Sequence, residues 1–152
     1  MTNTLLTNSV LKVLALDLEG TLIASALNPI PRPGLYQFLE WCKSRFKRIV
    51  IYTSVEENKF RSVAGILVKN NMVPPWFKDM DYIEWDGMLK DLYNIDGIAS
   101  EQAILVDDAE IFILENQKSQ WIEIKQFESP YSADDKELSR VANIIEGDYL
   151  KL

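Results

Sequence analysis

The sequence contains no histidine and only one cysteine among its 152 residues. Without histidine, the chain cannot build an imidazole zinc site or a Ser-His-Asp triad, and no imidazole can act as a general base. The single thiol, Cys42, excludes an intrachain disulfide and gives no sign of an oxidising compartment. Any catalysis must therefore use carboxylates, lysines, hydroxyls, this one thiol or a hard metal ion.

An excess of basic residues and long apolar runs are also missing. The chain has 16 Lys and Arg against 23 Asp and Glu, a net charge of −7. This balance argues against non-specific binding of nucleic acids or anionic membranes, because both need a positively charged surface. No stretch reaches the length of a membrane span, and the opening MTNTLLTNSV does not resemble a secretory signal. We expect a cytoplasmic protein, a monomer or weak dimer, folded as one domain over residues 1–152.

Two kinds of apolar segment alternate along the chain. Short β-branched and aliphatic runs are typical of strands buried on both faces of a parallel sheet, and they occur at Val10–Leu16, Ile49–Tyr52, Ala103–Val106 and Trp121–Ile124. Helical spacing of apolar residues is found within Leu35–Cys42, Phe60–Leu67 and Leu138–Ile145, and a further helix is expected over Ala109–Asn116. The alternation predicts a three-layer α/β fold with a central parallel sheet and right-handed crossovers.

Boundary signals refine this prediction. Pro33 suits the first turn of the first helix, and Ser132 with Asp135 resembles a capping arrangement for the last. The less regular segment Val73–Trp85 is interpreted as a loop whose aromatic residues Trp76 and Phe77 pack onto the sheet edge. The alternative interpretation is that these two aromatic residues are exposed and contact a substrate or partner.

Polar residues follow the predicted strands, where ligands bind in open α/β sheets. Asp17 and Glu19 come after the first strand and point the same way on an extended backbone, and Gly20 allows a sharp turn behind them. Thr53 and Ser54 follow the second strand. Their hydroxyls suit either a phosphate oxygen or the N-cap of the next helix.

Paired acids and a lysine complete the set. Asp107 and Asp108 follow the third predicted strand and suit Mg²⁺, although Asp108 alone would also suit a helix cap. Lys90, taken alone, reads as a solvated surface lysine. Phosphoryl transfer needs a nucleophile, a metal ion, a cation on the phosphoryl oxygens and a proton donor. Asp17, the two paired acids, Lys90 and Glu19 can fill these roles together.

With these motifs in this order, the sequence resembles the haloacid dehalogenase (HAD) superfamily of phosphatases. The ordered motifs are Asp-Leu-Glu-Gly-Thr from Asp17, a strand closing in Thr-Ser, a lysine, and a strand closing in Asp-Asp. The chain is most similar to the NIF/FCP/SCP-like branch, in which a helix follows Arg-Pro-Gly, here Arg32-Pro33-Gly34. The likeness runs from about Val13 to Ile111. It implies a Rossmann-like HAD fold without a cap domain.

The resemblance also implies a mechanism. Asp17 would attack phosphorus and form an aspartyl-phosphate. Glu19, which stands where the family usually has a second Asp, would protonate the leaving group and then activate water. The implied phosphate-binding residues are Thr53, Ser54 and Lys90, and the implied Mg²⁺ ligands are Asp17, Glu19 (through its backbone carbonyl), Asp107 and Asp108.

The predicted function is that of a Mg²⁺-dependent phosphohydrolase acting on a phosphomonoester. Only the short segment Leu22–Pro31 separates the first motif from Arg32, so nothing should cover the site. An open site suits a bulky phosphoprotein better than a small metabolite. One alternative is a catalytically impaired HAD-like binding or scaffold protein, suggested by Glu19 and by Pro74–Phe77. Another is phosphotransfer to an acceptor other than water. Converging carboxylates repel one another, so the metal-free protein should have at least one raised carboxyl pKa.

Overall fold

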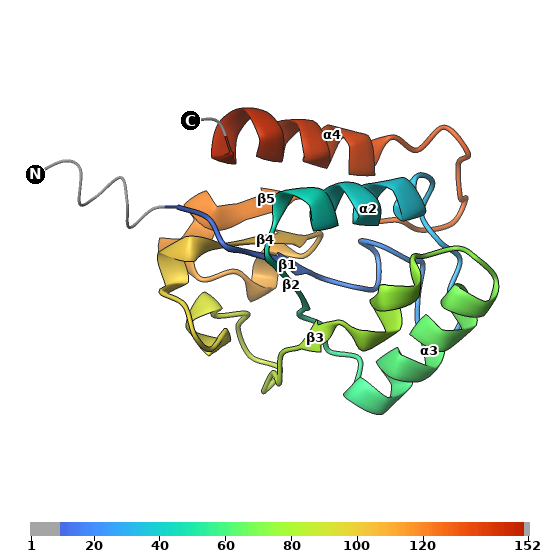
Figure 1. Ribbon diagram of the computed structural model, residues 1–152, viewed down its shortest axis with the longest axis horizontal. Coiled ribbons are helices and arrows are strands. Elements are labelled where there is room, and N and C mark those ends of the chain that lie inside the picture. The colour runs from blue at the N-terminus through green and yellow to red at the C-terminus, as the bar shows by residue number, and fades with distance from the viewer. Residues whose placement is uncertain (1–9, 151–152) are drawn as a thin grey trace, which may run out of the picture.

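The computed structural model describes residues 10–150 of the chain. Its five strands form one parallel sheet in the order β3-β2-β1-β4-β5 (Figure 1). Their bounds are β1 Val13–Leu16, β2 Arg48–Ile51, β3 Asp81–Tyr82, β4 Ala103–Asp107 and β5 Trp121–Glu123. The four predicted strands are confirmed with small shifts at their ends. The opening residues 1–9, which we expect not to be a secretory signal, lie outside the described residues.

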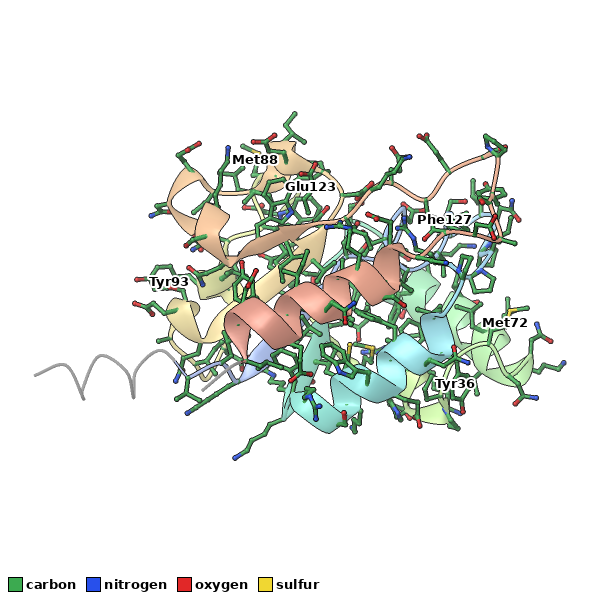
Figure 2. The ribbon with its side chains drawn as sticks, turned by 90° about the horizontal axis from the view of Figure 1, so that it is seen from above. Tyr36, Met72, Met88, Tyr93, Glu123 and Phe127 are labelled. Carbon is green, nitrogen blue, oxygen red and sulfur yellow. The ribbon has the colours of Figure 1, made fainter. Side chains whose placement is uncertain are left out.

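Three α-helices cover one face of the sheet. They are α2 (Leu35–Arg45), α3 (Glu57–Lys69) and α4 (Glu137–Ile144), each matching a predicted helix. Figures 1 and 2 show α2 and α4 lying side by side over this face. Their apolar stripes pack with the sheet side chains of Leu14, Leu16 and Ile104 in the larger core cluster.

The opposite face is covered by short 3₁₀ helices and their connections. Val13, Ala15 and Leu105 point to this side and pack against Leu92 and Ile113 in a smaller core cluster. The 3₁₀ helices that follow β3 and β4 are Leu92–Asn94, Ser100–Gln102, Glu110–Phe112 and Glu115–Gln120. The third layer of this α/β fold therefore consists, among the described residues, of short 3₁₀ helices of one or two turns, with no α-helix.

The order of the strands explains why the layers differ. From β1 the chain steps to β2 and then β3 in one direction, crosses back to β4, and steps on to β5. With right-handed crossovers, connections that step in opposite directions lie on opposite faces of the sheet. The strand order reverses between β1 and β4, which are paired neighbours, so the carboxyl ends of these two strands mark the expected ligand site.

Two predicted helix starts are wrong in detail. Gly34 takes a left-handed conformation with φ 83° as the N-cap of α2, so Pro33 lies in the turn before the helix. Likewise, α4 begins at Glu137 rather than near Ser132. The Asp135 carboxylate, not Ser132, accepts the Glu137 N–H at 3.0 Å.

The helix predicted over Ala109–Asn116 is also wrong. This stretch forms the 3₁₀ turn Glu110–Phe112 and enters a second one at Glu115. A tertiary contact competes with helix formation, because the Phe112 carbonyl accepts the backbone N–H of Lys90 at 2.8 Å. An α-helix would use that carbonyl internally.

The aromatic residues of Val73–Trp85 pack inward, as the first interpretation predicts. Phe77 is fully buried and meets the Phe60 ring edge-on at a centroid distance of 5.6 Å. Trp76 is half-buried, and the Lys43 ammonium lies 4.9 Å from its ring centroid. The alternative of an exposed pair is therefore wrong for Phe77. Across residues 10–150, no helix is both long and apolar enough to cross a membrane.

The larger core cluster provides a test of the fold. Phe60 on α3 is completely buried, whereas Ile66 on the same helix is 50% exposed. We expect Phe60→Ala to lower the free energy of unfolding by about 3–5 kcal/mol, because it leaves a cavity next to Phe77. Ile66→Ala, the matched control, should cost less than about 1 kcal/mol. Urea denaturation measures both, and equal losses would contradict this packing.

Candidate active site

Two carboxylates meet where the strand order reverses. Asp17 directly follows β1, and Asp107 is the last residue of β4. The two strands pair in register, with Leu16 opposite Val106, and the Asp17 N–H donates to the Val106 carbonyl at 3.0 Å. Parallel pairing therefore brings together two acids that lie far apart in the sequence.

Lys90 bridges these two acids. Its ammonium donates to Asp17 Oδ1 at 3.0 Å and to Asp107 Oδ2 at 2.5 Å. The side chain is buried, so the interpretation of Lys90 as a solvated surface lysine is wrong. The rings of Trp85 and Phe112 lie 5.2 and 5.8 Å from the ammonium and add cation–π attraction while shielding it from water.

A hydrogen-bond network holds the backbone that follows Lys90. The buried side chain of Gln117 accepts the Leu92 N–H at 3.0 Å and donates to the Asp91 carboxylate at 2.9 Å. The Tyr52 hydroxyl donates to the Asp91 carbonyl at 2.9 Å. The sequence analysis missed Gln117 because an isolated glutamine carries no signal of the segment it will contact.

Both oxygens of the Asp17 carboxylate have a donor. Lys90 takes Oδ1, and the buried Thr21 hydroxyl donates to Oδ2 at 2.8 Å. The turn that returns Thr21 toward Asp17 uses Gly20 at φ 79°, a left-handed conformation that favours glycine. A Cβ at Gly20 would lie 2.6 Å from Asp108 Oδ2, so any larger residue here would push the Asp108 carboxylate out of place. Thr21 was missed as a site residue, although it closes the first motif.

Three carboxylates form a cluster that suits a hard cation. One oxygen from each of Asp17, Asp107 and Asp108 lies within 4.8 Å of the other two. The cluster carries three negative charges when ionised, and Lys90 supplies one positive charge against them. Carboxylate oxygens converging at a partly buried site are the donors that Mg²⁺ prefers. The side chains present therefore fit the magnesium ion that the sequence analysis expects.

The carboxyl groups titrate abnormally because they share this buried site. Burial raises the pKa of Asp17 from 3.8 to about 6, against the lowering effect of Lys90 and with a further rise from Asp108. Burial also raises the pKa of Asp107 and of Asp108. Burial alone would lower the pKa of Lys90, but the charges of Asp17 and Asp107 outweigh it and the pKa rises. At least one carboxyl pKa is raised, as predicted, although burial raises these pKa values more than repulsion between the carboxylates does.

The carboxylate of Glu19 lies outside this cluster. Its Oε2 atom accepts the backbone N–H of Ala26 at 2.6 Å and so closes the loop that follows the first motif. Isolated bridges pair Ile23 with Glu19 and with Pro31 in the same loop. The proposed acid–base role of Glu19 stays a prediction.

The two hydroxyl residues after β2 differ in exposure. Thr53 is buried and its hydroxyl accepts the Val55 N–H at 3.2 Å, whereas Ser54 is exposed. Neither caps α3, because that helix begins at Glu57 with Glu56 as its N-cap. Similarly, Asp107 rather than Asp108 accepts the Ala109 N–H, at 2.9 Å. Phosphate binding by Thr53 and Ser54 stays a prediction.

Comparison with known proteins identifies a matching family. The family model for NLI interacting factor-like phosphatases matches residues 12–151. The matched region contains every candidate site residue and extends well past Ile111, where the motif resemblance ends. No curated protein matches the sequence significantly.

The acidic cluster predicts a pH-dependent stability in the metal-free protein. Folding raises the Asp17 pKa from 3.8 to about 6. The contribution of Asp17 to the stability of the metal-free protein should therefore be greatest below pH 3.8, where Asp17 is neutral in both the folded and the unfolded state, and should be lost as pH rises through about 6. An Asn cannot ionise, so Asp17→Asn should become more stable than wild type across this window, by up to about 3 kcal/mol.

Urea denaturation in EDTA at a series of pH values measures this difference. The exposed Asp134 has no side-chain partner among the described residues, so Asp134→Asn is the control and should show no such trend. A difference between Asp17→Asn and wild type that does not change with pH would contradict the electrostatic picture.

Proposed function

The chain belongs to the NLI interacting factor-like phosphatase family, and on this premise we propose that it is a Mg²⁺-dependent phosphohydrolase acting through Asp17. The observation that supports the proposal most is the arrangement of this one carboxylate. Lys90 donates a hydrogen bond to one of its oxygens and Thr21 to the other, at the carboxyl end of β1. A carboxylate fixed in this way is oriented to attack without first losing conformational freedom.

The proposed first step forms an aspartyl-phosphate. A carboxylate oxygen of Asp17 bonds to phosphorus as the bond from phosphorus to the ester oxygen breaks, and the leaving oxygen takes a proton. Asp17 must be ionised to attack, and the ammonium of Lys90, 3.0 Å away, favours the ionised form. Lys90 then also balances the charge on the transferred phosphoryl group.

The magnesium ligands in this proposal are Asp17, Asp107 and Asp108, together with the backbone carbonyl of Glu19. The first three already have oxygens within 4.8 Å of one another. When bound, Mg²⁺ would offset the negative charge of the cluster and polarise the phosphoryl oxygens.

Glu19 is the proposed general acid and base. It would give a proton to the leaving oxygen, then take one from the water that hydrolyses the aspartyl-phosphate. Its Oε2 atom accepts the Ala26 N–H, whereas Oε1 has no hydrogen-bond donor among the described residues. Glu19 can thus exchange a proton through Oε1 while Ala26 keeps the side chain in place.

The substrate proposed is a phosphomonoester on a bulky group, such as a phosphoprotein. The segment between Thr21 and Arg32 is short and closes on itself through the pairing of Ile23 with Pro31. It therefore leaves the site open, which suits a large substrate better than a small metabolite. The buried Thr53 and the exposed Ser54 complete the proposed phosphate-binding set with Lys90.

A second candidate function is a phosphatase-like binding module with little turnover. The specific observation in its favour is that the Glu19 carboxylate is engaged with the Ala26 N–H at 2.6 Å. If that bond holds the side chain away from substrate, phosphate could bind without efficient hydrolysis. Turnover measurements distinguish the two functions.

We expect hydrolysis of p-nitrophenyl phosphate in Mg²⁺, and loss of this activity both in EDTA and in Asp17→Asn. The physical reason is that neither the nucleophile nor the charge balance of the cluster can be replaced by the rest of the chain. Asp134→Asn serves as the matched control and should keep full activity. Hydrolysis that persists in EDTA or in Asp17→Asn would rule out the proposed mechanism.

Replacing the proposed proton donor gives a separate result. Glu19→Gln should lower kcat by roughly 10²–10⁴-fold, because an amide cannot transfer the proton. The same variant should still bind Mg²⁺, since only the backbone carbonyl of Glu19 is assigned to the ion. A Glu19→Gln protein as active as wild type would remove Glu19 from the mechanism and leave the nucleophile assignment intact.

A further inference from the structure

We infer that Arg32 is a positioning residue: it ties the turn behind Asp17 to the segment between β5 and α4 and so keeps the nucleophile in place. This inference rests on the proposed function, because it assigns Arg32 a role in the chemistry of Asp17. Arg32 is only 1% exposed although it carries a full positive charge. A buried guanidinium needs partners for all its donors, and these partners identify what it holds.

The guanidinium of Arg32 contacts two separate stretches of chain. On one side, Nη1 donates to the Gly20 carbonyl at 3.1 Å and to the Thr21 carbonyl at 3.2 Å. On the other side, Nη2 donates to the Lys125 carbonyl at 2.6 Å, and Nε donates to the Asp135 carboxylate at 3.1 Å. Arg32 thus clamps the turn of the first motif to the chain that follows β5.

Two further contacts strengthen this clamp. The Phe127 N–H donates to the Gly20 carbonyl at 2.8 Å, next to the Arg32 bond. The ring of Phe127 lies 5.3 Å from the Arg32 guanidinium carbon, within range of a cation–π contact. Figure 2 labels Phe127 on the extended segment beyond the sheet. The ring of Phe127 therefore covers the Arg32 guanidinium, and the backbone N–H of Phe127 donates to the same Gly20 carbonyl that Arg32 contacts.

The clamped turn is the part of the chain that positions the carboxylates. The Thr21 hydroxyl donates to Asp17 Oδ2 at 2.8 Å, so a shift of the Thr21 backbone moves this donor. Gly20 lies against Asp108, as the 2.6 Å approach of a Cβ built at this glycine shows. Arg32 touches neither acid, and it acts on both through the two carbonyls that it holds.

Only arginine can make this set of contacts. Its planar fork presents five donors in fixed directions, whereas a lysine ammonium is a single centre on a flexible stem. A lysine at this position would reach either the carbonyls of the turn or the Asp135 carboxylate. The charge would be kept, but the guanidinium's link between the two stretches would be lost, and only the Phe127 N–H bond to the Gly20 carbonyl would still join them.

A merely structural arginine is available for comparison. Arg48, at the start of β2, donates to the Asp81 carboxylate at 2.7 Å and to Asp96 at 2.6 and 2.9 Å. It also ties distant segments, but at the amino end of the sheet, away from Asp17. Arg48→Ala is therefore the matched control for losing a bridging guanidinium.

The test measures amide hydrogen exchange and steady-state kinetics in Arg32→Lys, Arg32→Ala and Arg48→Ala. The Gly20 and Leu22 amides, which bond within the turn to Ile23 and Leu18, report its local order. In the Arg32 variants we expect their exchange to quicken at least about tenfold relative to β4 amides, and kcat to fall about 10- to 100-fold with little change in KM. Arg48→Ala should show neither effect.

Each outcome decides the inference. Turn amides that exchange as in wild type, or a kcat loss no greater than in Arg48→Ala, would overturn it. If Arg32→Ala does not fold, Asp135→Asn weakens the same clamp from its other side and should shift the same amides by a smaller factor. If wild type hydrolyses no phosphate ester, the proposed function fails, while the exchange data still decide whether Arg32 holds the turn.

Discussion

The structure depends on one buried electrostatic arrangement, in which the Lys90 ammonium lies between the carboxylates of Asp17 and Asp107. Burying three carboxylates within a few ångströms of one another is unfavourable, and the raised pKa of Asp17 records that cost. One ammonium offsets part of the repulsion, and the remainder favours a divalent cation. This charge imbalance in the metal-free protein is the physical basis of the Mg²⁺ and phosphoryl binding that we propose for the site.

The rest of the chain keeps these groups in place. Parallel pairing of β1 with β4 sets the spacing of Asp17 and Asp107 without any loop having to define it. The contacts of Gln117 hold the backbone after Lys90, and Arg32 holds the turn that carries Thr21. The helical face of the sheet supplies the larger core. The opposite face, built of short 3₁₀ helices and their connections, brings Lys90 to the carboxyl ends of β1 and β4.

Much of the fold, but only part of the site, could be predicted from the sequence. The apolar runs identified four strands and the helical spacing identified three helices, because burial on a sheet face imposes a local pattern. Strand β3 was missed because it has only two residues, Asp81 and Tyr82, which are too few to show a periodic pattern of apolar residues. Lys90 alone looked like a surface lysine, and only the ordered motifs placed it at the site, because its burial depends on Asp17 and Asp107, which lie far from it in the sequence. The helix predicted after β4 failed because the Phe112 carbonyl accepts the Lys90 N–H instead of a helical donor. The acidic cluster could be predicted because Asp17, Asp107 and Asp108 follow predicted strands whose carboxyl ends meet. The role of Arg32 could not be predicted, because it depends on contacts with residues far along the chain.

The most direct test is calorimetric titration of Mg²⁺ into the protein, compared with Asp107→Asn and the exposed control Asp134→Asn. The account predicts that wild type and Asp134→Asn bind a single Mg²⁺ and gain thermal stability as it binds, since a ligand of the folded state stabilises it. Asp107→Asn should lose most of the affinity, because it removes a ligand and one of the charges that the ion offsets. Equal Mg²⁺ binding by all three proteins, or none by wild type, would contradict the claim that these carboxylates form one cation-dependent site.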